Sequence, residues 1–177
     1  MVRCFVGFFL PESVKERIVS VQEEIKKLPI VCKFVERENL HICFSFLGNV
    51  EEKSLEGIIS SLNDVCRGVK PIRATLDGIK IIPNENFIRV LALDVVSSEL
   101  EELSYKINKK VGGDTKPSHV TLCRVKKLEN RGYVVQKLKE IRMGKTDFLV
   151  DSIYLIKSEL KKGGPVYSVI KKFELVF

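Results

Sequence analysis

The sequence predicts an α+β fold made of two similar lobes that enclose a central groove. Three observations support this prediction. A strand–helix–strand–helix order occurs in each half of the chain, hairpins lie between, and each half carries one copy of a short histidine-containing segment. We expect each lobe to be a mainly antiparallel sheet with helices packed on its outer side. At 177 residues the chain can bury a substantial core, so residues 1–177 are expected to form a single bilobal domain.

The first half of the chain contains two strand signals, each followed by a helix signal. An apolar run opens the chain, and Pro11, which suits the first turn of a helix, comes next. Gly48 ends the second strand signal, and the helix after it has apolar residues at the spacing of one buried face. The predicted elements are a strand at 2–9, a helix at 11–28, a strand at 40–47 and a helix at 51–66.

The second half begins with a hairpin and then repeats the order of strand and helix. The turn-forming residues Pro83-Asn84-Glu85-Asn86 join two apolar strands, and Gly112-Gly113 precedes the second histidine segment. A loop rich in lysine and glycine separates the last two strands. The predicted elements are strands at 72–82 and 87–95, a helix at 98–111, a strand at 119–125, a helix at 130–141, and strands at 146–157 and 166–177.

The composition favours an intracellular protein with an anionic partner. Its five cysteines are odd in number, scattered, and form no Cys-x-x-Cys pair, which disfavours a disulfide framework and a structural zinc site. No N-terminal stretch has the apolar length of a signal peptide or a membrane helix. We therefore expect a cytoplasmic protein without membrane contact. The formal net charge of +7 favours a polyanionic partner, although lysine-rich solvated surfaces are common.

The chain contains only two histidines, and both open the same kind of segment. His41 starts a His-apolar-Cys-apolar run, and His119 starts a His-apolar-Thr-apolar run. Because side chains alternate along a strand, His41, Cys43 and Ser45 should share one face, as should His119 and Thr121. A single histidine at a strand start is usually a satisfied polar residue. Two histidines in matching contexts favour two imidazoles that face one cleft.

Two such imidazoles are suited to acid–base catalysis. A histidine pKa of about 6.5 allows one ring to be neutral and the other protonated near neutral pH. Each positioned proton transfer raises the reaction rate by about 10²- to 10⁴-fold. Two other uses of these residues stay open. Cys43 could be a nucleophile, although on a strand it would lie about 7 Å along the chain from its neighbouring histidine. Zinc could bind, although structural sites usually take four clustered ligands. We expect no metal and no cofactor.

Both histidine segments and both chain ends resemble the two-histidine phosphoesterase superfamily, and within it the RNA 2′,3′-cyclic phosphodiesterases historically called 2′-5′ RNA ligases. The resemblance covers essentially the full chain. It rests on Arg3-Cys4-Phe5-Val6-Gly7 with Pro11, on residues 38–48 around His41, on residues 117–125 around His119, and on residues 154–160 and 164–167. The departure is Cys43, which stands where the family usually has threonine. A thiol is a weaker hydrogen-bond donor than a hydroxyl.

The resemblance implies metal-free hydrolysis of RNA 2′,3′-cyclic phosphate ends to 2′-phosphomonoesters. It implies that His41 is the proton donor, which protonates the departing ribose 3′ oxygen, and that His119 is the proton acceptor, which activates water. The two roles could be exchanged, because they depend on how the substrate is oriented. We expect Thr121 to donate to a nonbridging phosphate oxygen, with Cys43 as its counterpart and Ser45 as a partial replacement for the missing hydroxyl.

Basic residues outside the motifs are candidates for RNA contacts. Arg124 and the pair Lys161-Lys162 could guide the RNA backbone, and the glycines after the lysines would let the chain approach phosphate closely. Simple alternation points Arg124 away from the histidine face, so a phosphate contact from it requires a β-bulge or a strand end. Phe44 and Phe46 also face away, and we expect them in the core.

Two other functions use the same features. Reversible 2′-5′ joining of RNA ends would employ the same groups in reverse. A non-catalytic module that binds RNA ends or nucleotides would fit the unusual Cys43, although a pure binder would not need either histidine to titrate. The expected partner is RNA with a 2′,3′-cyclic phosphate terminus, for example a transfer RNA fragment, and the protein is expected to be a monomer.

Overall fold

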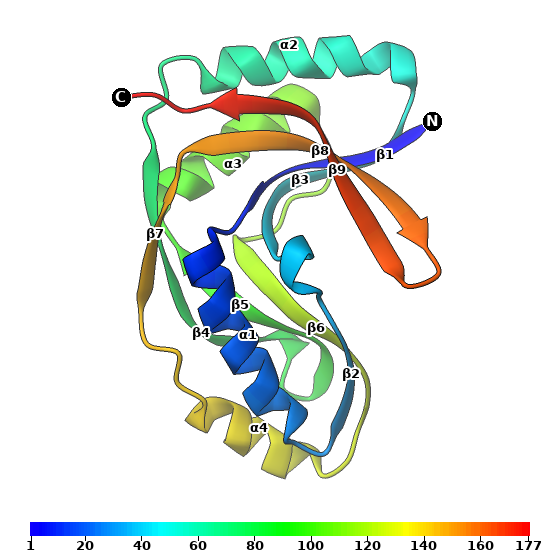
Figure 1. Ribbon diagram of the computed structural model, residues 1–177, viewed down its shortest axis with the longest axis vertical. Coiled ribbons are helices and arrows are strands. Elements are labelled where there is room, and N and C mark those ends of the chain that lie inside the picture. Colours follow the sequence, from blue (N-terminus) through cyan, green and yellow to red (C-terminus); the bar gives the residue numbers. More distant parts are fainter.

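The computed structural model describes residues 1–177, and its nine strands form one curled, antiparallel sheet (Figure 1). The strand order is β7-β4-β5-β6-β3-β1-β8-β9, and β2 pairs with β6 outside this path. The strands are β1 Val2–Phe9, β2 Ile30–Phe34, β3 His41–Val50, β4 Ile72–Asn84, β5 Phe87–Val96, β6 His119–Leu128, β7 Thr146–Val150, β8 Ser152–Lys161 and β9 Gly164–Glu174. The helices are α1 Glu12–Lys26, α2 Leu55–Cys66, α3 Ser98–Val111 and α4 Arg131–Glu140.

The sheet divides into two lobes, which confirms the predicted α+β fold class. One lobe contains β3, β1, β8 and β9, and the other contains β7, β4, β5, β6 and β2. The two halves of the sheet are not separate, because β3 and β6 pair with each other where Ile42 meets Val120. Each of these residues directly follows a histidine in the sequence. The junction between the lobes therefore sets the two histidine segments side by side.

The helices cross between the halves of the chain, which alternation of elements along the sequence does not reveal. Helix α1 follows β1 of the first lobe but packs against β2 and β6 of the second, whereas α3 follows β5 of the second lobe and packs against β3 of the first. Figure 1 shows α1 and α4 on the lower lobe and α2 and α3 on the upper lobe. Each lobe is thus assembled from both halves, because an apolar helix face packs wherever the larger apolar surface lies.

Two features of the sheet differ from the sequence prediction. The predicted strand at 146–157 is two strands, β7 and β8, separated at Asp151, and they pair with β4 in one lobe and with β1 in the other. The short strand β2 was not predicted, because its five residues include the charged Lys33 and show no fully buried face. Both features depend on partner strands that are distant in the sequence.

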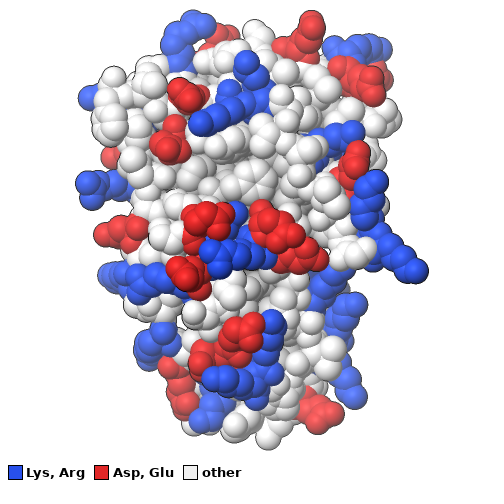
Figure 2. Space-filling view, in the orientation of Figure 1, with Lys and Arg blue, Asp and Glu red and all other residues white.

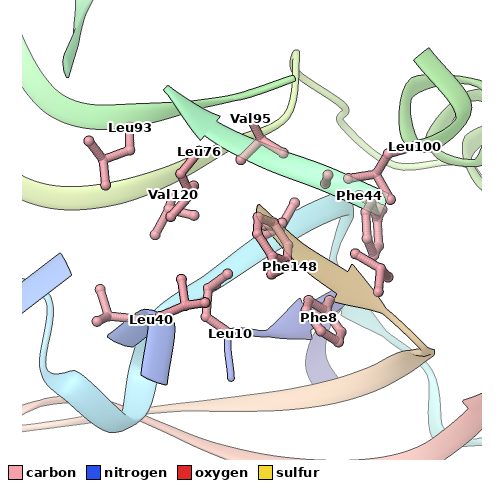
Figure 3. Close-up of a cluster of buried hydrophobic side chains, with 14 of the residues drawn as sticks. Phe8, Leu10, Leu40, Phe44, Leu76, Leu93, Val95, Leu100, Val120 and Phe148 are labelled. Carbon is pink, nitrogen blue, oxygen red and sulfur yellow. The ribbon is translucent and has the colours of Figure 1, made fainter. Parts of the chain in front are cut away.

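A continuous apolar core runs beneath both lobes (Figure 3). Phe8 of β1 and Phe148 of β7 stack across the junction with ring centroids 6.3 Å apart. Phe44, as predicted, is fully buried in this core, together with Val120 from the second histidine segment. Each such side chain contributes about 1.5–3 kcal/mol through burial. The two strands that carry the histidines therefore pack on the same core. No helix combines the length and apolarity needed to cross a membrane.

Candidate active site

Both histidine strands contain a β-bulge at the same position of the motif. In β3, Cys43 pairs with Gly7 and Ser45 pairs with Val6, so Phe44 has no partner on β1. In β6, Thr121 pairs with Ala92 and Cys123 pairs with Leu91, so Leu122 has no partner on β5. Each bulge comes three residues after a histidine. A β-bulge bends its strand and redirects the side chains that follow it.

The carbonyl group of each bulged residue is satisfied from outside the ladder. The Phe44 carbonyl accepts hydrogen bonds from Thr115 Oγ1 at 2.8 Å and from the buried Ser104 Oγ of α3 at 3.1 Å. The Leu122 carbonyl accepts from the backbone N–H of Val35 at 2.9 Å and from the buried Gln22 Nε2 of α1 at 3.0 Å. Because a buried carbonyl without a partner is costly, these donors stabilise the bulges.

A glycine makes room for the first bulge. Gly7 lies opposite Cys43, and a Cβ atom at this position would come within 2.5 Å of the carbonyl oxygen of Ile42. No real Cβ atom tolerates such a contact, so β1 requires glycine here to approach β3.

The bulges reverse the alternation of side chains beyond them. Ser45 and Cys123 are fully buried, whereas Phe46 and Arg124 line the cleft that contains the histidines. This corrects the expectation that Phe46 belongs to the core and fulfils the condition under which Arg124 could reach a phosphate, namely a bulge. Both strands change face for the same reason. Each contains one residue, Phe44 or Leu122, that has no cross-strand partner.

Ser45 does not reach the cleft, in contrast to its predicted place beside the phosphate. Its hydroxyl donates a hydrogen bond to the Gly112 carbonyl at 2.5 Å and accepts one from Asn108 Nδ2 at 3.4 Å. Gly113 follows with a φ of +93°, and a Cβ atom there would lie 2.6 Å from the Ser45 hydroxyl. Ser45 therefore anchors β3 to the glycine loop after α3.

The cleft lies between the lobes and collects the other motif side chains. It has a volume of about 490 Å³ and is lined by His41 and Cys43 from one lobe and by His119 and Thr121 from the other. All four side chains are half-buried. The structure thus brings together the two histidines and the two residues that stand two positions after them.

Both imidazole rings are held in the same way. Nδ1 of His41 lies 2.7 Å from the Asn39 carbonyl oxygen, and Nδ1 of His119 lies 2.8 Å from the Pro117 carbonyl oxygen. A carbonyl oxygen only accepts, so each Nδ1 carries a proton and donates it. When the ring is neutral, Nε2 is then the basic nitrogen, and when the ring is charged, Nε2 is the free acid. Either histidine can give or take a proton at Nε2.

The two imidazoles differ in their surroundings. His41 packs against Phe5, with centroids 4.8 Å apart, and meets the edge of Tyr167 at 5.3 Å. Burial lowers the pKa of His41 below its ordinary value, and the nearby His119 lowers it further, while the hydrogen bond to Asn39 opposes this shift. Burial also raises the pKa of Tyr167, which remains a neutral hydroxyl at the wall of the cleft.

The thiol of Cys43 is poorly suited to nucleophilic attack. Burial raises its pKa to about 12, and the carboxylate of Asp114 contributes in the same direction. The thiolate is the nucleophilic form of cysteine, and reactive cysteines have lowered pKa values. Cys43 is therefore a protonated S–H group, which can act only as a weak donor.

Cations that the motif did not indicate also line the cleft. Arg3, Lys33 and Lys116 join Arg124 there, and the acids in the lining are Glu36 and Asp114. Lys116 forms an ion pair with Asp114 at 3.1 Å.

Arg3 has the most unusual environment of these cations. Its guanidinium lies 4.8 Å from the centroid of the Phe46 ring, and its buried Nε has no hydrogen-bond partner. Arg3 and Tyr167 stand in the segments that carry the family resemblance, although nothing in those segments assigned them a role. Lys33 was not predicted as a site residue, because the strand that carries it, β2, was not predicted.

The hairpin of β8 and β9 borders the cleft through residues at the ends of its two strands. Leu160, Gly164 and Pro165 belong to the lining, whereas Lys161 and Lys162 do not. Asn39 Nδ2 donates to the Pro165 carbonyl at 3.0 Å and ties this hairpin to the residues before His41. No three His, Cys, Asp or Glu side chains are grouped in a way that could hold a metal ion.

Comparison with known proteins agrees with this geometry. The family described as LigT-like phosphoesterase matches residues 8–92. A protein of Methanocaldococcus jannaschii named RNA 2′,3′-cyclic phosphodiesterase is 35% identical over 97% of this chain and 100% of its own length. A protein of Aquifex aeolicus with the same name is 31% identical over 99% of this chain and 98% of its own length. A crystal structure of a Thermus thermophilus protein has a TM-score of 0.82 at 27% identity and covers 98% of this chain and 97% of that chain.

Proposed function

The chain belongs to the LigT-like phosphoesterase family, and on this premise we propose that it hydrolyses RNA 2′,3′-cyclic phosphate ends to 2′-phosphomonoesters. The observation that carries this proposal is the matched presentation of His41 and His119. Both rings donate Nδ1–H to a backbone carbonyl and line one cleft, which leaves two Nε2 atoms for proton transfer. Relatives that share nearly the full length of this chain carry this activity in their names.

The reaction needs one base and one acid. Neutral His119 takes a proton from water at Nε2, and the water oxygen attacks phosphorus in line with the bond to the ribose 3′ oxygen. That bond breaks, and protonated His41 gives its Nε2 proton to the departing oxygen. The phosphate remains on the 2′ oxygen. The two histidines end with exchanged protonation states and are reset by solvent.

Other cleft residues stabilise the charge on phosphorus. We assign the Thr121 hydroxyl and the Cys43 S–H group, which line the cleft from different lobes, as donors to the nonbridging oxygens. The guanidinium groups of Arg3 and Arg124 supply positive charge to the same cleft. Donors positioned before the reaction are often the largest catalytic contribution, with about 10²- to 10³-fold lost when one is removed.

The lowered pKa of His41 gives a way to test its role as the acid. Burial favours the neutral ring, and the negative charge of a bound phosphodiester favours the protonated ring. In a His119→Ala variant, His41 is the remaining titrating imidazole. If His41 is the acid, residual kcat/KM falls as the pH rises through its pKa. A rise over the same pH range would assign His41 as the base and exchange the two roles.

The proposed activity is tested with a short RNA that ends in a 2′,3′-cyclic phosphate, in excess chelator. Wild type should convert it to a 2′-phosphate, and both His41→Ala and His119→Ala should lose this conversion. Tight binding by wild type without conversion would instead identify a module that binds RNA ends, and a 3′-phosphate product would reject the proposed bond cleavage.

Weak 2′-5′ ligation fits the same site, because the 5′-hydroxyl of a second RNA can replace water as the nucleophile. His119 then takes the hydroxyl proton, the bond from phosphorus to the ribose 3′ oxygen breaks, and His41 protonates that oxygen, which leaves a 2′-5′ diester. Weak ligation is also compatible with membership of the LigT-like phosphoesterase family. Ligation should therefore be lost in the same two variants as hydrolysis.

The cellular setting extends the same proposal. The net charge of +7 favours a polyanionic substrate, of which a transfer RNA fragment is one example. The cytoplasm is a suitable compartment because all five cysteines are free thiols. A monomer suffices, since one chain supplies both histidines, and the shared core supports residues 1–177 as one folding unit. Lys161 and Lys162, outside the cleft lining, would contact RNA beyond the reacting nucleotide.

A further inference from the structure

A second groove lies beside the active-site cleft, between the start of β5 and the far half of β6. It has a volume of about 450 Å³. Its lining includes four cations and no acidic residue, and it also includes one large aromatic side chain. These five residues are Phe87, Arg89, Lys126, Lys127 and Arg131.

The groove continues the charged surface of the cleft along one face of the sheet. Arg124, in the cleft, pairs with Lys33, and Lys127, in the groove, pairs with Val31. Because Val31 and Lys33 are two residues apart on β2, their side chains lie on the same face, and so do those of their partners. Figure 2 shows lysine and arginine side chains along the lower right edge of the molecule, where β2 and β6 run in Figure 1. A bound polymer that extends from the cleft in this direction passes the cations Lys33, Arg124 and Lys127.

Two of the cations stand at further β-bulges. Ile88 and Val90 pair with consecutive residues of β4, so Arg89 has no partner there, and Lys126 likewise has no partner on β2. Bulges redirect side chains at sheet edges and beside functional sites. The two bulges lie on different walls of the groove, one on β5 and one on β6. The side chains at these bulges, Arg89 and Lys126, both line the groove.

The aromatic side chain is available for stacking. Phe87 is 56% exposed, and the Arg89 guanidinium lies 4.8 Å from the centroid of its ring. Exposed aromatic rings next to arginine are the platforms on which proteins stack unpaired bases, and such stacking tolerates any base sequence. A base-paired stem would not present its base faces to Phe87.

The cations of this groove are weakly neutralised by the protein itself. Only Lys127 has an acidic partner, Glu129, at 3.8 Å. In the β8–β9 hairpin, the other basic element near the cleft, Glu159 pairs with Lys157 at 2.9 Å and with Lys161 at 3.4 Å. The groove is therefore the more favourable site for the RNA segment next to the reacting nucleotide, and Lys161 and Lys162 of the hairpin are left to contact RNA farther from it.

We propose that this groove binds the single-stranded RNA segment that precedes the reacting 3′ end. The inference rests on the proposed function, because it assumes that the cyclic phosphate occupies the cleft between the histidines. The RNA backbone follows the cations of β6, and an upstream base stacks on Phe87.

The test compares two substrates that differ only in the presence of upstream RNA, namely a 2′,3′-cyclic mononucleotide and a single-stranded oligonucleotide with the same terminus. Phe87→Ala and the double variant Arg89→Ala/Lys126→Ala should each lower kcat/KM for the oligonucleotide about tenfold, as expected for a lost base stack or lost phosphate contacts. Hydrolysis of the mononucleotide should stay within about twofold. Lys109→Ala/Lys110→Ala, which removes two exposed charges from α3, is the matched control and should change neither rate.

Salt dependence gives a second readout. The oligonucleotide affinity of the double variant should depend less on salt, with the slope of log K against log salt reduced by about 1.4 for two lost contacts. Equal loss on both substrates, or an unchanged oligonucleotide rate, would overturn the proposal. So would a blunt RNA duplex that binds as tightly as the single strand. If wild type hydrolyses neither substrate, the proposed function fails, and anisotropy with labelled oligonucleotide still tests the groove by itself.

Discussion

Strands β3 and β6 present their histidines through the same backbone device but surround them with different chemistry. In each strand the histidine Nδ1 donates to a carbonyl two residues earlier, and a bulged residue follows at the third position after the histidine. The bulged carbonyl accepts from a buried side chain on a helix, Ser104 of α3 in one lobe and Gln22 of α1 in the other. The crossing of α1 and α3 between lobes thus supplies equivalent supports.

The side chains on the two frameworks are not equivalent. Cys43 and Phe46 of β3 correspond in position to Thr121 and Arg124 of β6. β3 therefore offers a weak donor and an aromatic ring to the cleft, and β6 offers a hydroxyl and a guanidinium. Symmetric geometry brings two imidazoles together, and asymmetric surroundings let them hold different protonation states, which acid–base catalysis requires.

The largest expected effect is the loss of either imidazole. His41→Ala and His119→Ala should each lower the rate of cyclic phosphate hydrolysis by about 10²- to 10⁴-fold, because each removes one positioned proton transfer. Rates with a cyclic-phosphate RNA measure this, and melting temperatures show whether the variants remain folded. If only one variant lost activity, the two strands would not share the chemistry.

The next effect separates the two donors. Thr121→Ala should lower kcat by about 10²-fold, because it removes the hydroxyl to which the proposed mechanism assigns stabilisation of charge in the transition state. Cys43→Ala should cost less than about tenfold, since a thiol donates weakly. Cys43→Thr should restore the donor and raise kcat. Equal losses in Thr121→Ala and Cys43→Ala would show that the lobes contribute equally to phosphate binding.

Ser45 should matter for stability and little for turnover. Ser45→Ala removes a buried hydrogen bond to the Gly112 carbonyl, so unfolding in urea should show a loss of about 1 kcal/mol. Turnover should change less than about twofold, because proton transfer and phosphate stabilisation do not involve the anchored hydroxyl. Cys123→Ala, at the corresponding buried position of β6, is the matched control. A large fall in kcat for Ser45→Ala alone would return Ser45 to the phosphate site.

The smallest effect concerns stability at acidic pH. Because burial lowers the pKa of His41 in the folded state, the unfolded chain binds a proton more readily at this residue. Its contribution to stability is therefore present above the unfolded pKa of about 6.5 and is lost as the pH falls below it. His41→Gln should reduce the difference in unfolding free energy between pH 7.5 and pH 5 relative to wild type. An unchanged difference would contradict the effect of partial burial on His41, which packs against Phe5 and Tyr167.

The positions of four site residues were predictable from strand alternation, because these residues precede the bulges at Phe44 and Leu122. His41, Cys43, His119 and Thr121 lie where strand alternation places them, and all four line the cleft. Beyond the bulges, alternation predicts the wrong face. Arg3 could not be placed, because its position depends on the pairing of β1 with β3.

The amino-acid sequence by itself determined the helices, most of the strands and the presence of two matching histidine segments. Apolar periodicity and motif spacing, on which these depend, are local properties. The tertiary structure alone decided that α1 and α3 exchange lobes, that Asp151 divides one predicted strand between two lobes, and that Phe44 and Leu122 have no cross-strand partners. Strand register and helix docking depend on contacts between residues far apart in the chain, and a residue's own neighbours in sequence do not specify them.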